Sequence, residues 1–238
     1  MTGHAAHAVS RGVLATAAAA VESFFLDSAA PEPAAEGAGP IEMRPVVCVI
    51  GLARGCGVTV VARALAAEFA LRDPAVAAVV CSDARPAGIP LATNAASKLA
   101  RILEDVPRAH PRAVGRLCLG GGDPQPLVQT ARHHAPVVID AGSESLTGAP
   151  AALADRVVIV TTCGVEPALA RVASECIARV GPAPFVVLNR APHDQPGLLA
   201  LPNSPLGARL ALGGREARGE LGRAIAELVD LIEDASVA

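Results

Sequence analysis

Six short apolar runs, separated by longer stretches of helical character, limit what this 238-residue chain can fold into. The runs are rich in valine and apolar on both faces, which is typical of parallel strands buried inside a sheet. Their alternation with helices favours an α/β fold: a doubly wound, mostly parallel β-sheet flanked by helices. The expected strands are 45–50, 76–82, 114–119, 136–140, 156–161 and 184–189, with a weaker candidate at 198–201. The expected helices are 58–72, 91–104, 124–134, 165–180, 206–212 and 217–233.

The first 43 residues differ from the rest of the chain. They contain one helix-forming stretch, 10–27, followed by a linker rich in Pro, Ala and Gly without apolar periodicity. The apolar part of that stretch is too short to span a bilayer. We therefore interpret 1–43 as an extension, either disordered or preceding a true start at Met43, and 44–238 as the folded domain.

Composition argues against several classes of partner. The net charge is -3, aromatic residues make up 2% of the chain, and no long basic run is present, so direct nucleic-acid binding is not expected. The helix expected at 217–233 carries acidic rather than basic residues on its polar face, which predicts packing on the core and no membrane anchor. The six cysteines form no CxxC pair, which indicates buried free thiols and a cytoplasmic protein.

The stretch GLARGCGVT, residues 51–59, joins the first expected strand to the first expected helix. The phosphate-binding P-loop reads GxxxxGK[ST], so Gly57 and Thr59 fit while Val58 stands at the lysine position. Gly55 and Gly57 allow backbone N–H groups to point at a phosphate, and the next helix adds its dipole. Thr59 offers a hydroxyl to Mg²⁺. The alternative is a plain glycine turn between a strand and a helix.

Polar side chains follow three other expected strands. Asp83 follows 76–82, Asp140 ends 136–140, and Asn189 with Arg190 ends 184–189. Carboxyl ends of parallel strands share one edge of the sheet, where ligands bind in such folds. Asp140 fits the Walker B pattern that holds Mg²⁺, and the Asn189 amide is suited to reading a base. The alternative for each is a turn or cap residue.

Taken in order, the loop, Asp83, Asp140, ADRVVIVTT (154–162) and VVLNR (186–190) resemble the MinD/ParA group of deviant Walker-type ATPases. The resemblance covers about residues 44–233. It implies ATP or ADP with Mg²⁺ as the ligand, and Thr59 and Asp140 as the groups that serve the metal. It also implies that Asp83 belongs to the switch region, with Asp83 and Asp140 as the catalytic carboxylates. The implied nucleotide-binding residues are Gly55, Cys56, Gly57, Thr59 and Asn189, and we add Arg54, Val58 and Arg190 as further candidates.

The departures from that family pattern concern charge. Ala53 replaces the lysine that reaches across a dimer, Val58 replaces the phosphate lysine, and Arg85 replaces a second switch aspartate. One lost charge-assisted contact costs ~1.5–3 kcal/mol, or roughly 10–150-fold in affinity. We therefore expect weakened nucleotide affinity and weak or absent hydrolysis.

Three functions fit these residues. The first is a nucleotide-binding regulatory or positioning switch that acts through a protein partner or a homodimer. The second is a nucleotide-free pseudo-ATPase that serves as an interaction module. The third and weakest is a relative of the cobyrinate/dethiobiotin-type ligases, whose phosphate chemistry needs the missing lysine.

Overall fold

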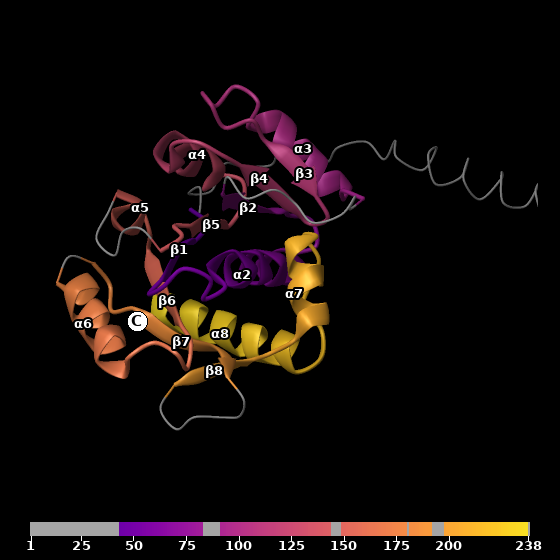
Figure 1. Ribbon diagram of the computed structural model, residues 1–238. Coiled ribbons are helices and arrows are strands. Elements are labelled where there is room, and N and C mark those ends of the chain that lie inside the picture. The colour runs from indigo at the N-terminus through magenta and orange to yellow at the C-terminus, as the bar shows by residue number, and fades with distance from the viewer. Residues whose placement is uncertain (1–42, 83–90, 144–148, 180, 192–197, 238) are drawn as a thin grey trace, which may run out of the picture. The chain divides into compact units, whose positions relative to one another are not determined.

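The fold is built on an eight-stranded sheet with β1 (Val46–Gly51) near its centre (Figure 1). The computed structural model describes residues 43–82, 91–143, 149–179, 181–191 and 198–237. All of them belong to one unit, Glu42–Ala238. The expectations for residues 1–42, and those for Asp83 and Arg85, lie outside the described residues and stay predictions.

The strand order along the sheet is β3-β4-β2-β5-β1-β6-β7-β8. Every neighbouring pair is parallel except β3 and β4, which confirms the predicted α/β fold with a mostly parallel sheet. The remaining strands are β2 (Ala78–Cys81), β3 (Arg112–Val114), β4 (Leu117–Gly120), β5 (Val137–Asp140), β6 (Arg156–Thr161), β7 (Phe185–Ala191) and β8 (Leu199–Pro202).

One expected strand, 114–119, is two strands in the structure. A turn at Gly115 separates β3 from β4, and β3 runs antiparallel along β4. Gly115 has φ +57°, and a Cβ there would collide with the carbonyl oxygen of Gly214. The chain therefore reverses at a position that only glycine fits.

The helices follow the predicted periodicity, and a side-chain cap sets the start of one of them. Thr93 Oγ1 accepts a hydrogen bond from Ala96 N–H at 3.2 Å, so the helix expected from residue 91 begins only after this cap. A short helix at Ala149–Ala152 was not expected from the sequence. The helices are α2 (Val58–Arg72), α3 (Asn94–Ile102), α4 (Pro124–Ala131), α5 (Ala149–Ala152), α6 (Pro167–Ala178), α7 (Pro205–Leu212) and α8 (Gly219–Val237).

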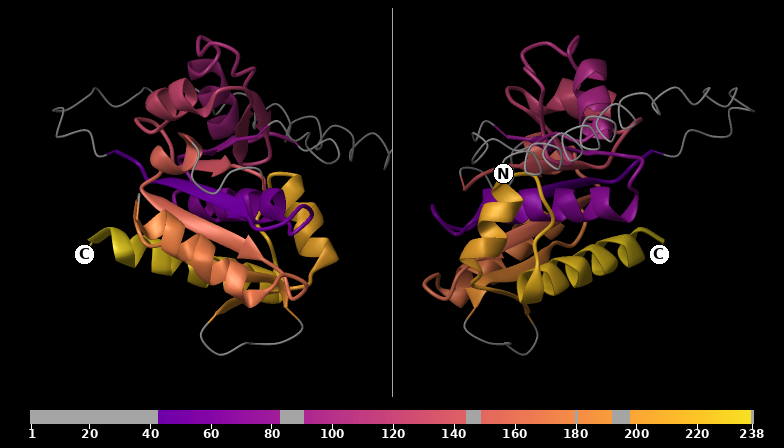
Figure 2. Two further views of the ribbon diagram at one scale, coloured as in Figure 1. Left: turned by 60° about the vertical axis from the view of Figure 1, so that its left-hand side comes forward. Right: turned by 90° about the vertical axis from the view of Figure 1, so that its right-hand side faces the viewer.

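The two faces of the sheet bury separate apolar clusters. In β1, Val47 and Val49 face the cluster formed with α2, α7 and α8, whereas Cys48 and Ile50 face the cluster of α3 to α6. This alternation follows from the two-residue period of a strand. Figures 1 and 2 show α2, α7 and α8 together on one side of the sheet.

Helix α8 packs on the core as predicted. Ile225, Leu228 and Ile232 are buried, whereas Leu231 is 43% exposed. Arg72 at the end of α2 binds two acidic residues of α8, Asp230 at 2.8 Å and Glu233 at 2.6 Å. Within the described residues, no helix combines the length and apolar character that crossing a membrane requires.

Four of the six thiols are buried as expected: Cys48, Cys56, Cys81 and Cys118. Burial raises the pKa of Cys48 to about 12, with a smaller contribution from Asp140, and burial raises the pKa of Cys118 to about 12. Cys163 is exposed, which corrects the expectation that all six are buried.

We expect Cys163 to react first with iodoacetamide in the native protein at about pH 8, because a buried thiol with a raised pKa has almost no thiolate there. Mass spectrometry of tryptic peptides measures the order of labelling. Cys163→Ser is expected to remove the fast phase. Fast labelling of Cys48 or Cys118 would contradict the described core.

Helix α8 offers a matched pair of leucines to test its packing. Leu228→Ala is expected to lower the free energy of unfolding by about 2–5 kcal/mol, because Leu228 is fully buried against α2 and the sheet. Leu231→Ala, one turn away on the exposed side, is expected to change it by roughly 0.5 kcal/mol or less. Denaturant unfolding compares the two, and equal losses would contradict this orientation of α8.

Candidate functional site

The loop between β1 and α2 rises from the middle of the sheet. Gly51 N–H donates to the Gly142 carbonyl at 2.7 Å, and Leu52 N–H donates to the Val160 carbonyl at 3.0 Å. These bonds join the base of the loop to β6 and to the segment that follows β5. The loop is therefore fixed at the carboxyl ends of three adjacent strands, where the sequence predicted a site.

Two glycines at the crest of the loop, residues 54–57, have left-handed backbone conformations. Gly55 has φ +78° and Gly57 has φ +94°, and Gly57 is the N-cap of α2. Across the described part of the chain, no backbone carbonyl takes up the N–H groups of Gly55, Gly57 or Thr59. Such N–H groups at a helix N-terminus favour an anion. The N–H of Cys56 is used differently, since it donates to the Ala53 carbonyl at 3.3 Å.

Cys56 and Val58 turn their side chains into the core beneath the loop. They are 2% and 7% exposed, and both belong to the cluster that includes α2 and α8. Cys56 Sγ and Val58 Cγ2 lie 2.6 Å and 2.5 Å from where a Cβ on Gly51 would stand. The position of the usual lysine is therefore an apolar contact under the loop. Arg54 is exposed at the crest.

The two candidate magnesium ligands lie on adjacent elements. Asp140 pairs in register with Val49 of β1, and Thr59 lies in the first turn of α2, which packs over β5. Asp140 Oδ2 accepts a hydrogen bond from Ser82 Oγ at 2.8 Å. The Thr59 hydroxyl makes no hydrogen bond to any described residue. One carboxylate and one hydroxyl, completed by phosphate and water oxygens, are a donor set that Mg²⁺ accepts.

No cluster of three or more His, Cys, Asp or Glu suited to a metal occurs among the described residues. A magnesium ion at Thr59 and Asp140 would therefore depend on the nucleotide for further ligands. Ser82 is a residue that sequence reasoning missed. Its position directly after β2 was the feature of the sequence that could have identified it.

Asn189 lies against the loop, at the carboxyl end of β7. It is 7% exposed, and its Nδ2 donates to the Cys56 carbonyl at 2.7 Å. Its Oδ1 accepts from Arg190 N–H at 3.0 Å. A Cβ on Gly57 would collide with Nδ2 of Asn189. The structure thus places the Asn189 amide against the loop, while roles of Asn189 and Arg190 in binding a nucleotide stay predictions.

Arg63 is a second residue that sequence reasoning missed. It lies one turn after Thr59 in α2, is fully buried, and donates from Nη1 to the Leu212 carbonyl at 2.8 Å. Burial lowers its pKa, and the charge of Asp140 acts in the opposite direction. An arginine within the apolar stretch VTVVARALAAEFA was the signal that could have found it.

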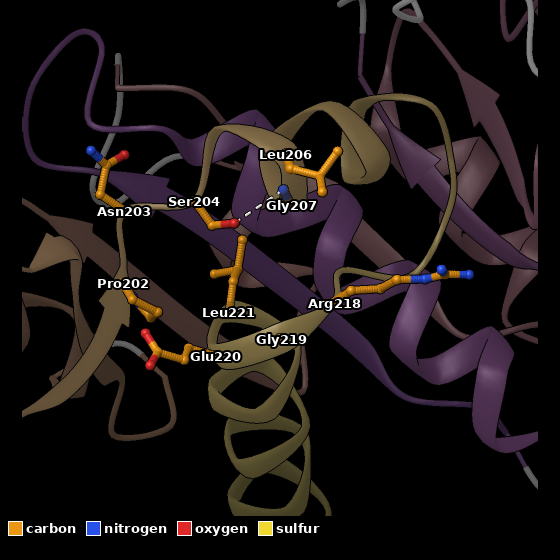
Figure 3. A pocket seen from close by; sticks show the side chains of 9 residues that line it. All are labelled: Pro202, Asn203, Ser204, Leu206, Gly207, Arg218, Gly219, Glu220 and Leu221. Atoms are coloured by element: carbon orange, nitrogen blue, oxygen red, sulfur yellow. Dashed lines mark hydrogen bonds between the residues drawn. The ribbon is translucent and has the colours of Figure 1, made fainter.

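A separate pocket of about 310 Å³ lies at the carboxyl end of β8, between the starts of α7 and α8 (Figure 3). Ser204 Oγ accepts from Gly207 N–H at 3.1 Å and so caps α7. Arg218 and Glu220, at the start of α8, also line the pocket, and their side chains point in opposite directions. No residue of the 51–59 loop lines this pocket.

Comparison with known proteins shows similarity in structure. No protein-family model matches the chain, and no curated protein matches it significantly. A ParA family ATPase from Chlorobium tepidum TLS superposes with a TM-score of 0.53 and 14% identity, covering 78% of this chain and 97% of that one. McdA from Cyanthece superposes with a TM-score of 0.52 and 12% identity, covering 79% of this chain and 99% of that one.

The MinD cell division protein of Aquifex aeolicus superposes with a TM-score of 0.50 and 14% identity, covering 79% of this chain and 96% of that one. The chain has a MinD/ParA-like fold. The resemblance inferred from the loop, Asp140 and Asn189 is therefore confirmed in the fold. At this identity the likeness concerns the MinD/ParA-like fold alone, so ligand and activity rest on this chain's own residues.

The two crest glycines provide a test of the loop geometry. Gly55→Ala is expected to lower the free energy of unfolding by about 1–2 kcal/mol, the cost of a left-handed alanine. Gly57→Ala is expected to cost more, because its Cβ would also displace the Asn189 amide. Denaturant unfolding measures both variants.

A double variant separates the two costs of Gly57→Ala. In an Asn189→Ala background, Gly57→Ala is expected to cost no more than Gly55→Ala, because the colliding group is gone. Equal costs of Gly55→Ala and Gly57→Ala in the native background would contradict the contact between Asn189 and the loop.

Proposed function

We propose that this protein binds ATP or ADP with Mg²⁺ and acts as a regulatory or positioning switch with weak or absent hydrolysis. The supporting observation is the loop itself, in which the N–H groups of Gly55, Gly57 and Thr59 have no backbone partner among the described residues and lie at the N-terminus of α2. Such an arrangement is pre-organised for phosphate oxygens, since no ordering of the loop is needed on binding.

Most of the expected site residues have a role in this proposal. The loop N–H groups would hold the phosphates, while the Thr59 hydroxyl and the Asp140 carboxylate would hold Mg²⁺. The positive charge that Val58 does not supply would come from Arg54 and Arg190. Both arginines are exposed, and neither forms an ion pair with another described residue. Asp83 would orient water in the switch region.

Weak hydrolysis follows from the burial of Val58. Its side chain packs beneath the loop and brings no charge to the phosphates. Loss of one group that stabilises transition-state charge costs about 10²–10³ in rate. The bound state would then persist long enough to control binding of a protein partner or a second copy of the chain.

A nucleotide-free interaction module is the second candidate. It is favoured by the packing of Cys56 and Val58 against Gly51, which stabilises the loop without any ligand. The two candidates differ in one measurable property, which is saturable binding of nucleotide.

We expect Mg·ATP and Mg·ADP to bind the full-length protein with dissociation constants of about 10–1000 μM, since one charged contact is missing. Isothermal titration calorimetry measures this binding. Thr59→Ala and Asp140→Asn are expected to weaken binding of the magnesium complexes by about tenfold or more, because each removes a metal ligand. Asp105→Asn, an exposed change outside the site, is the control that should leave binding unchanged.

Val58→Lys is the complementary variant. A lysine stem can follow the apolar wall and place its ammonium at the loop, so nucleotide affinity is expected to rise by about 10–100-fold. Saturable binding that is lost in Thr59→Ala and gained in Val58→Lys supports the switch. The absence of binding by the native protein up to several millimolar nucleotide would favour the interaction module.

A further inference from the structure

We infer that Ser82 is a positioning residue for Asp140: its hydroxyl holds one carboxylate oxygen, so that the other is presented to the metal of a bound nucleotide. This inference rests on the proposed function and names a residue that controls the metal dependence of that site. Its basis is the position of Ser82 directly after β2 and the hydrogen bond of 2.8 Å from Ser82 Oγ to Asp140 Oδ2.

The register of two adjacent strands brings Ser82 and Asp140 together. β2 and β5 are parallel, with Cys81 in register with Ile139, so the next residues along the two segments are Ser82 and Asp140. Val138, two residues before Asp140, belongs to the apolar cluster that includes α2. Because side chains alternate along a strand, Asp140 lies on the face of the sheet that α2 covers.

The main chains of both residues are held by neighbouring strands. Ser82 N–H donates to the Gly120 carbonyl at 2.8 Å, which extends the pairing of β2 with β4 by one residue. Asp140 pairs in register with Val49 of β1. The hydrogen bond between the two side chains therefore joins backbones whose positions are determined by the sheet.

The chemistry of the two groups gives this hydrogen bond one direction. An ionised carboxylate only accepts, and a serine hydroxyl has one proton to donate, so the Ser82 proton is directed to Oδ2 of Asp140. Oδ1 of Asp140 accepts no hydrogen bond from any described residue. Because a bond to Oδ2 restricts the rotation of the carboxylate, it also determines where Oδ1 lies. Oδ1 is thus the oxygen that is fully open to Mg²⁺ or to a water molecule on it.

Hydrogen bonds to a ligating carboxylate support metal binding in proteins, and their loss typically weakens metal affinity by about 10–100-fold. Thr59 and Asp140 are the two protein groups expected at the metal, and the described residues include no cluster of three or more His, Cys, Asp or Glu suited to one. Ser82 therefore contributes to binding of the magnesium complex. It contributes little to binding of metal-free nucleotide, whose phosphates would meet the N–H groups of the loop.

The test compares Mg·ADP with ADP in excess EDTA on the full-length protein, by isothermal titration calorimetry. Ser82→Ala is expected to weaken binding of Mg·ADP by about tenfold and to change binding of metal-free ADP by less than about threefold. Ser82→Thr keeps a hydroxyl and is expected to restore most of the Mg·ADP affinity. Ser97→Ala is the matched control, because it removes a serine hydroxyl that donates to the Thr93 carbonyl in α3, and it should change neither.

A double-mutant cycle shows whether Ser82 acts through Asp140. In an Asp140→Asn background, Ser82→Ala is expected to change Mg·ADP affinity by less than about twofold, because the carboxylate that Ser82 positions is gone. An undiminished effect of Ser82→Ala in that background, or unchanged Mg·ADP affinity of Ser82→Ala alone, would overturn the inference and leave the proposed function standing. Equal weakening of both forms of ADP would do the same. Failure of the native protein to bind either form would overturn both.

Discussion

The position of β1 between β5 and β6 is the constraint on which the candidate site depends. Hydrogen bonds on both sides of β1 fix where the strand ends, and the loop begins there with Gly51 bonded to Gly142 and Leu52 bonded to Val160. Because these strands are parallel, Asp140 of β5 ends beside the loop without any further device. The order of the strands therefore determines that Asp140 lies beside the loop.

The loop keeps its shape through packing in addition to any ligand. Cys56 and Val58 fill the space above Gly51, and the Asn189 amide fills the space beside Gly57. Apolar burial of two side chains and one hydrogen bond to a carbonyl therefore stabilise a backbone path that exposes N–H groups. The loop therefore lacks the positive charge of a lysine but keeps a backbone path that exposes its N–H groups.

The sequence predicted the architecture well because buried parallel strands and amphipathic helices have simple periods. Helix α2 begins and ends where its period predicted, and Asp140 was placed at the correct edge of the sheet. The split of 114–119 was missed because the reversal depends on Gly115 meeting Gly214, a contact between distant parts of the chain. The bonds of Asn189 and the burial of Arg63 were missed for the same reason, since no local pattern reports a tertiary partner.

The most direct test of the account observes the loop amides themselves. In ¹⁵N-labelled full-length protein, titration with Mg·ADP should shift the amide signals of Gly55 and Gly57 along a saturable curve, with Thr59 following the same curve. Those N–H groups have no backbone partner in the described structure, so a bound phosphate would be their acceptor under the proposed function. Unchanged Gly55 and Gly57 signals up to several millimolar Mg·ADP would contradict a phosphate site at this loop.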